Sequence, residues 1–474
     1  MSKKNLKTEH EAFREIVEFA ESYDADEKKV IKMVGDFLSA GFSVNTIDGN
    51  GYNLLHYAAI WKMSDLADYL MAAKIDCEQR DIRKQTPLDI AISNAEFNGS
   101  TTESNSILEN LIFEGARLEK NNPNLLDILS CINYQCDFSK EVAQKIYAIF
   151  SDAQKKDVEK AASALTFLNW QYSERGHLID VACAIELMEK YGTRDEKLQE
   201  NNAVFLQALE IIKSGKLVEI GDKKIIVIQA PYEGHVGFFV ISCNKDEVPE
   251  EVFYCDSYCL LNLEKNDEVY NYAVEGFKIG SPAPSLKKLK QNISCNFRFD
   301  YEVNPDVFSS SDCKKLIQKA FRIAEKEKSQ LEIPTKKQGN WRSICAFKST
   351  KVAMRLIAKL ISSQEYCLDE TGQKPRGELY DRYKTFTTNM IDAAIDDLVE
   401  VAKKKDEPYY KACQAAVSRF MVAAQRKAVE KTGDAKLLNE VRLQKFKSCK
   451  EPAAVVSKES GSASALVSEA RLSL

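Results

Sequence analysis

The sequence predicts a multidomain protein in which an all-α array of paired helices is followed by an α+β domain and a helical C-terminal region. Three observations predict this order. A pattern of turn, apolar and alanine positions recurs after 33 residues near the start of the chain. Three short runs rich in Val, Ile, Phe and Tyr lie between residues 223 and 258. Amphipathic helical patterns then dominate after residue 345.

Composition limits the possible functions. The chain has 474 residues, of which 29% are charged and 44% hydrophobic, as in globular proteins with more than one domain. A net charge of −5 argues against a broad nucleic-acid surface. No stretch approaches the roughly 20 apolar residues of a membrane helix, and the start, MSKKNLKTEHEAF, lacks the apolar core of a secretory signal. We expect no direct nucleic-acid or membrane partner, and any export must use a non-classical route.

The cysteines and histidines do not form a metal-binding pattern. Thirteen cysteines are scattered without a CxxC pair, and the chain has only four histidines. We therefore expect no metal site, no disulfide scaffold and a reducing environment. The chain also lacks a phosphate-binding glycine loop, an HExxH motif and a dinucleotide fingerprint, so we expect no cofactor.

The 33-residue repeat aligns Asp48 with Asp81, and NLLHYAA (53–59) with TPLDIA (86–91). Thr86 suits a helix cap and Pro87 a first helical turn, while the alanines allow two helices to approach closely. This pattern resembles the ankyrin repeat. The resemblance implies an all-α ankyrin solenoid over residues 1–155, with a degenerate unit at 122–135 and an opening helical unit at 10–40. The polar segment NAEFNGSTTESN (94–105) is expected to be a surface insertion between two helices.

Helix ends also recur in this region. Gly41 and Gly115 follow equivalent apolar endings and are predicted to adopt the left-handed conformation that closes a helix. At the middle repeat, Lys74 stands where that glycine is expected.

Exposed turn residues of such an array are candidates for contact with a partner protein. They are Asp48, Asn50, Tyr52, Trp61, Arg80 and Arg83. The alternative is that each is an ordinary turn residue. We interpret His56 as structural, because ankyrin repeats carry a structural histidine at that position.

The three apolar runs KKIIVIQA, HVGFFVIS and EVFYCDSY are predicted strands. HVGFFVIS is apolar on both faces, so we expect it to be central and buried. If it pairs antiparallel with EVFYCDSY and Ile241 lies opposite Glu250, then His235 lies opposite Asp256 at one sheet edge. A carboxylate beside an imidazole orients the ring, as in a catalytic triad, although a purely structural His–Asp pair fits the same pattern.

Cys345 is the candidate nucleophile. The run AFKSTKVAMRLIAKLI is an amphipathic helix with Cys345 in its first turn, where the helix dipole stabilises a thiolate. Gln338 precedes it on a glycine-containing loop, from which its amide can reach a developing oxyanion. Cys183 could serve instead, but it lies in the apolar run VACAIEL and is predicted to pack within a helix.

The order His, Asp, Gln, Cys resembles the cysteine peptidases of the clan that contains ubiquitin-like-protein proteases and YopJ-type effectors. The resemblance implies an α+β cysteine protease-like domain over 156–365, with His235 as base, Asp256 as its orienter, Gln338 in the oxyanion hole and Cys345 as nucleophile. Ile344 departs from the family, which has an acidic residue there. The 89 residues from Asp256 to Cys345 exceed the usual interval and imply an inserted cap at 261–330.

The rest of the chain adds a helical region at 366–450 and a tail at 451–474 that is rich in Ser, Ala and Glu and is expected to be disordered. With ankyrin repeats added, the chain resembles the ankyrin effectors of Legionella. That resemblance implies type IV secretion into the host cytoplasm or nucleus, a C-terminal translocation signal, and a monomer that binds host proteins through its repeats. We expect a thiol peptidase or isopeptidase; the alternatives are a binding scaffold with an inactive fold and a YopJ-type acyltransferase.

Overall fold

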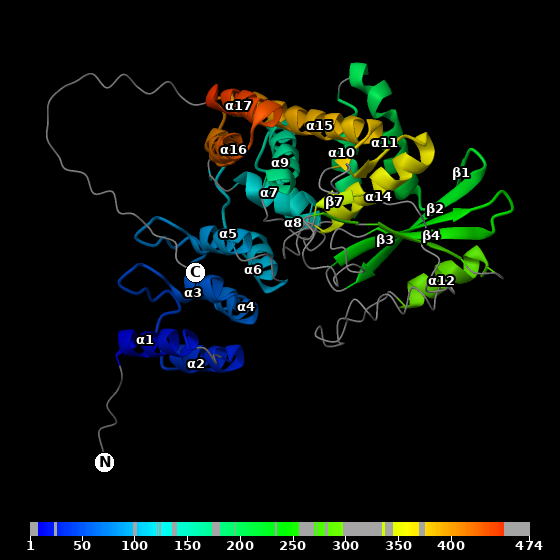
Figure 1. Cartoon of the computed structure of the whole chain (residues 1–474). Helices are drawn as coiled ribbons and strands as arrows, with labels where there is room; N and C mark the ends of the chain where they lie inside the picture. Colours follow the sequence, from blue (N-terminus) through cyan, green and yellow to red (C-terminus); the bar gives the residue numbers. More distant parts are fainter. Residues whose placement is uncertain are drawn as a thin grey trace, which may run out of the picture.

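The computed structural model of the chain describes residues 8–22, 26–97, 102–120, 122, 125–134, 140–172, 181–194, 196–232, 235–255, 270–272, 274–279, 283–296, 334–336, 345–368 and 375–449. Over these residues the fold is mixed α+β and mostly helical, with one main antiparallel sheet (Figure 1). The tail at 451–474, expected to be disordered, lies outside the described residues.

The N-terminal part consists of helix pairs that stack on one another (Figure 1). The helices are α1 (Glu9–Ala20), α2 (Glu27–Ser39), α3 (Leu54–Trp61), α4 (Ser64–Ala72), α5 (Pro87–Phe97), α6 (Thr102–Phe113), α7 (Leu125–Tyr134) and α8 (Lys140–Tyr147). Each pair packs on the next through its second helix: α2 contacts α4, α4 contacts α6, and α6 contacts α8. The pairs therefore bury a continuous row of apolar side chains.

Local chemistry sets where these helices begin and end. Thr86 caps α5 as predicted, since its Oγ1 accepts a 3.2 Å hydrogen bond from the Asp89 amide. Gly41 and Gly115 both have positive φ after their helices, which confirms the predicted helix endings. Lys74, at the position where glycine was expected, also has positive φ, at 63°.

The predicted insertion at 94–105 differs from its expected form. Residues 94–97 belong to α5 and residues 102–105 to α6, so most of the polar segment extends the two helices instead of forming a loop. The polar residues lengthen these helices to 11 and 12 residues, compared with 8 and 9 in the preceding pair. Helix formers in this segment, such as alanine and glutamate, favour that outcome.

Three further helices lead to the sheet: α9 (Asp152–Tyr172), α10 (Val181–Gly192) and α11 (Glu196–Ser214). Helix α9 packs against α7, so it continues from the helix pairs without a break in the core. The domain boundary expected at residue 155 lies in the first turn of α9.

The main sheet has five antiparallel strands in the order β1-β2-β3-β4-β6. They are β1 (Val218–Ile220), β2 (Lys223–Tyr232), β3 (His235–Cys243), β4 (Pro249–Cys255) and β6 (Val274–Lys278). Phe238 and Phe239 face opposite sides of β3, and both are fully buried. The prediction of a central, buried strand is therefore confirmed.

Helices cover both faces of this sheet (Figure 1). Helix α12 (Leu286–Asn296) covers one face through Leu289 and Ile293, while α14 (Cys345–Ser362) and α11 pack on the other. The region 261–330 was expected to be an inserted cap, but β6 and α12 belong to the sheet and its cover. Because β6 pairs antiparallel with β4, β6 is a strand of the main sheet and not part of a separate cap.

Two small two-stranded sheets join β5 (Tyr270–Tyr272) to β7 (Pro334–Lys336), and β8 (Cys367–Leu368) to β9 (Pro375–Arg376). The C-terminal helices are α15 (Glu378–Ala402), α16 (Tyr410–Glu430) and α17 (Gly433–Lys447). Helix α15 packs on α9, α10 and α11, and α16 packs on α7 and α9. The predicted helical C-terminal region is thus confirmed and is joined to the earlier helices through one core.

Candidate functional site

Two of the four residues expected to be catalytic begin elements of the fold. Cys345 is the first residue of α14, as predicted, and His235 is the first residue of β3. Helix α14 packs against β3 and β4, so the two elements that carry these residues are in contact. Asp256 follows Cys255, the last residue of β4, and lies outside the described residues, as does Gln338.

The register of β3 and β4 differs from the one assumed. Ile241 pairs with Val252, not with Glu250, so the predicted register is wrong by two residues. A tight turn at 244–248 replaces the long open loop, because the Asn244 side chain accepts 3.0 Å hydrogen bonds from the amides of Asp246 and Val248. A shift of two keeps every described residue on its predicted face of the strand.

The two faces of β3 are covered by different helices. Phe239 and Ile241 pack with the α12 side chains, whereas Phe238 and Val240 belong to the core that includes α14. Helix α14 therefore packs on the face of β3 that carries Phe238 and Val240.

Helix α14 also carries a buried cationic cluster that sequence reasoning missed. Arg355 is 7% exposed, donates a 2.9 Å hydrogen bond to the Tyr366 hydroxyl and lies 5.0 Å from the Tyr383 ring centroid. Burial acts to raise the pKa of Tyr383, but the charges of Lys351 and Arg355 outweigh it and lower the pKa. The sequence signal was the spacing of Lys351, Arg355 and Lys359 at every fourth position of an apolar helix.

This cluster fixes the helix that begins at Cys345. Lys359 Nζ donates a 3.0 Å hydrogen bond to the Tyr366 carbonyl, which ties the end of α14 to the strand that follows. Phe347, two residues after Cys345, is buried against Phe167 and Trp170 of α9. The backbone at the start of α14 is therefore held by packing.

The alternative nucleophile, Cys183, lies in α10 and is half-buried, with contacts to the main core. The prediction that it packs within a helix is confirmed.

The hairpin turns of the N-terminal repeat have the same hydrogen bonds 33 residues apart. Asp48 accepts a 2.8 Å hydrogen bond from the Tyr52 amide, and Asp81 accepts one of 2.7 Å from the Gln85 amide. Neighbouring turns are joined by a 3.0 Å bond from the Ile82 amide to the Asn50 carbonyl. The repeated sequence pattern therefore corresponds to repeated turn geometry.

The six candidate partner contacts divide into two groups. Asn50, Arg80 and Arg83 are exposed, as expected. The expectation of exposure is wrong for the other three, which are half-buried: Asp48, Tyr52 and Trp61. Asp48 accepts a 2.8 Å hydrogen bond from the Tyr57 hydroxyl, and the Tyr57 ring stacks on Trp61 at 4.8 Å, so these residues help to hold the turn.

His56 is buried and structural, as predicted. Its Nδ1 accepts a 3.2 Å hydrogen bond from the Asn53 amide, and its Nε2 lies 3.2 Å from the Gln85 carbonyl oxygen in the next repeat. Burial lowers its pKa below the usual histidine value. A neutral imidazole therefore links adjacent turns.

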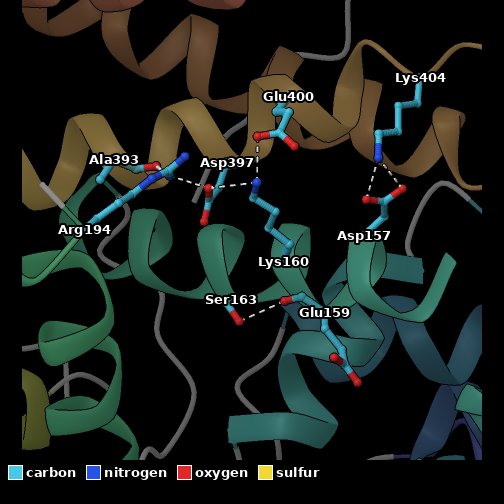
Figure 2. Close-up of polar contacts among 9 residues, drawn as sticks. All are labelled: Asp157, Glu159, Lys160, Ser163, Arg194, Ala393, Asp397, Glu400 and Lys404. Atoms are coloured by element: carbon cyan, nitrogen blue, oxygen red, sulfur yellow. Dashed lines mark hydrogen bonds and ion pairs between the residues drawn. The ribbon is translucent and has the colours of Figure 1, made fainter. Parts of the chain in front are cut away.

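An ion-pair network joins α9 and α15 (Figure 2). Asp397, 4% exposed, pairs with Arg194 and, at 3.4 Å, with Lys160. Lys160 also lies 2.6 Å from Glu400. Burial raises the pKa of Asp397, and the two cations oppose that change. Because these pairs connect residues far apart in sequence, they hold the C-terminal helices against the middle of the chain.

The described residues contain neither a membrane-spanning helix nor a metal site. No helix there is both long and apolar enough to cross a membrane. Nor does that part of the chain bring three or more His, Cys, Asp or Glu side chains together as a metal site.

No protein-family model matches the chain. The structure is similar to a solved structure described as that of the Legionella effector AnkH, over 91% of this chain and 99% of the other. The sequence identity is 13% and the TM-score is 0.37. A TM-score this low establishes neither a shared fold nor a shared activity.

Proposed function

We propose that the protein is a secreted bacterial effector with an ankyrin-type array and a thiol-hydrolase site at Cys345. The sequence resemblance supports the effector class and the ankyrin assignment. The hydrolase site rests on one structural observation: Cys345 begins a helix of 18 residues that packs on the strand beginning at His235.

In this proposal Cys345 is the nucleophile of acyl transfer from a peptide or isopeptide bond of a host protein. The unpaired amides and the dipole at the start of α14 stabilise the thiolate. His235 takes the thiol proton and returns it to the leaving amine, and Asp256 orients the imidazole. Gln338 and nearby amides stabilise the oxyanion, and water then releases the acyl group from the sulfur.

Thiol reactivity tests this proposal. Iodoacetamide labelling of the native protein, mapped by mass spectrometry, is expected to modify Cys345 at least about tenfold faster than Cys183, a half-buried helical thiol. His235→Ala is expected to reduce the rate at Cys345 and to leave the rate at Cys183 unchanged. Equal rates at the two thiols, or no effect of His235→Ala, would exclude a triad.

The acyl donor distinguishes a hydrolase from a transferase. A YopJ-type acyltransferase uses the same residues but takes its acyl group from acetyl-coenzyme A. Incubation with labelled acetyl-coenzyme A is expected to leave Cys345 unlabelled if the site is hydrolytic. Label on Cys345 that then passes to a protein lysine would favour the transferase.

A binding scaffold is the second candidate function, and the exposed hairpin tips favour it. Ile82 is 71% exposed and is followed by the exposed Arg83, in a turn that the buried Asp81 holds. An exposed isoleucine on a rigid turn is suited to contact with another protein. Loss of effector activity in Ile82→Asp, with Cys345→Ser fully active, would favour the scaffold.

A further inference from the structure

Lys427 of α16 lies beside the C-terminal end of α9. Its Nζ donates a 3.1 Å hydrogen bond to the Gln171 carbonyl and lies 4.2 Å from the ring centroid of Tyr172. The Tyr172 hydroxyl accepts a 3.4 Å hydrogen bond from Nη1 of Arg442, on α17. Tyr172 therefore lies between two cations that come from different helices.

Two of these residues carry a buried side-chain donor that has no acceptor among the described residues. The donors are Nη2 of Arg442 and Nε2 of Gln171. The Arg442 side chain is only 6% exposed, and its Nε is already paired with Asp392 at 2.8 Å. Buried N–H groups without an acceptor are rare because they lose their hydrogen bonds to water. Each of these two donors would gain a hydrogen bond from an added acceptor.

Positive charges outnumber negative charges around Lys427. Arg426 has a long 4.0 Å ion pair with Glu430, and Lys431 directly follows the end of the helix, whereas the described residues provide no ion pair for Lys427. Burial, and then the charges of Arg442, Arg426 and Lys431, lower the pKa of Lys427 to about 8. Anionic groups would relieve both the repulsion and the unpaired donors.

We propose that the cluster formed by Gln171, Tyr172, Lys427 and Arg442 binds a small phosphate-type oxyanion. The anion would accept hydrogen bonds from Arg442 Nη2, Gln171 Nε2 and Lys427 Nζ. Lys427 is only half-buried, so its side chain can move aside to admit the anion to the buried guanidinium. This site is separate from Cys345 and does not depend on the thiol-hydrolase proposal.

Binding is linked to the protonation of Lys427. The bound anion stabilises the ammonium, so affinity is expected to fall as the pH rises above about 8, through the pKa of the free protein. The charged groups that act on this amine are the permanently charged Arg442 and Arg426, and Lys431 and Glu430. The titratable Tyr172 also lies against it. Phosphate is already a dianion over this range, so its own titration does not produce the effect.

Thermal unfolding of the full chain in phosphate, compared with chloride at equal ionic strength, tests the proposal. Phosphate in excess is expected to raise the Tm of the wild-type protein by roughly 2–4 °C. Lys427→Met is expected to keep or raise the Tm in chloride, because it removes a desolvated charge, and to abolish the phosphate shift. Lys411→Met changes an exposed lysine on the same helix and is expected to keep the full shift.

Gln171→Met provides a second test, because it removes a donor that is unpaired in the free protein. It is expected to fold normally and to lose part of the phosphate shift. Failure of phosphate to raise the wild-type Tm, or an equal rise in Lys427→Met, would overturn the proposal.

Discussion

Lys74 occupies a backbone conformation that suits glycine. Its φ is 63°, and its amide donates a 2.9 Å hydrogen bond to the Met71 carbonyl at the end of α4. Gly41 and Gly115 close α2 and α6 in the same left-handed region without a steric penalty. A lysine with a Cβ is strained at this position by roughly 1 kcal/mol.

We therefore expect Lys74→Gly to stabilise the protein by up to about 0.5 kcal/mol, after the added freedom of the unfolded chain is subtracted. Lys32→Gly is the matched control: it changes an exposed lysine inside α2 and should destabilise by about 1 kcal/mol. Urea unfolding followed by circular dichroism measures both. A loss of stability in Lys74→Gly would show that the lysine is not strained there.

At the scale of elements, α9 and α15 are joined by apolar packing and by the ion pairs of Figure 2. The side chain of Asp397 is 6% exposed, whereas that of Glu400 is 55% exposed, although both pair with Lys160. Removing the charge of a buried carboxylate leaves its cations without a partner, and this costs far more stability than removing the charge of an exposed carboxylate.

Asp397→Asn is expected to destabilise the protein by about 2–4 kcal/mol, while Glu400→Gln should cost less than about 1 kcal/mol. Thermal and urea transitions of the two variants, measured side by side, test the difference. Similar losses in both variants would mean that burial does not decide the strength of this network.

At the scale of the whole molecule, the C-terminal helices complete the core of the preceding region. Helix α15 packs on α9, α10 and α11, and Arg419 of α16 forms a 2.7 Å ion pair with Asp127 of α7. Phe386 of α15 stacks on Phe205 of α11 at 5.1 Å, and both side chains are fully buried. Removal of α15 would expose these faces to water.

A chain truncated after residue 366 is therefore expected to lose its cooperative unfolding transition and to aggregate. A chain truncated after residue 449 keeps every described helix and should unfold like the full-length protein. Calorimetry and size-exclusion chromatography measure both. A soluble, cooperatively folded product ending at 366 would contradict the view that the C-terminal helices complete the core.

The sequence pattern predicted most local elements because their causes are local. The 33-residue repeat predicted the cap at Thr86 and the helix endings at Gly41 and Gly115, and short apolar runs predicted β2, β3 and β4. The strand register was missed, because it depends on how a particular turn folds at Asn244. Of the candidate site, the placement of Cys345 at a helix start was predicted, since one amphipathic run defines that helix.

The sequence by itself determined the order of elements, the repeat and the central strand, because hydrophobic periodicity and capping act over a few residues. Only the tertiary structure decided that α14 packs on one face of β3 while α12 covers the other, and that β6 belongs to the main sheet. It also brought Gln171, Lys427 and Arg442 together from three helices. Such contacts join residues of different elements, and their free energy depends on burial and distance, which periodicity along the chain does not encode.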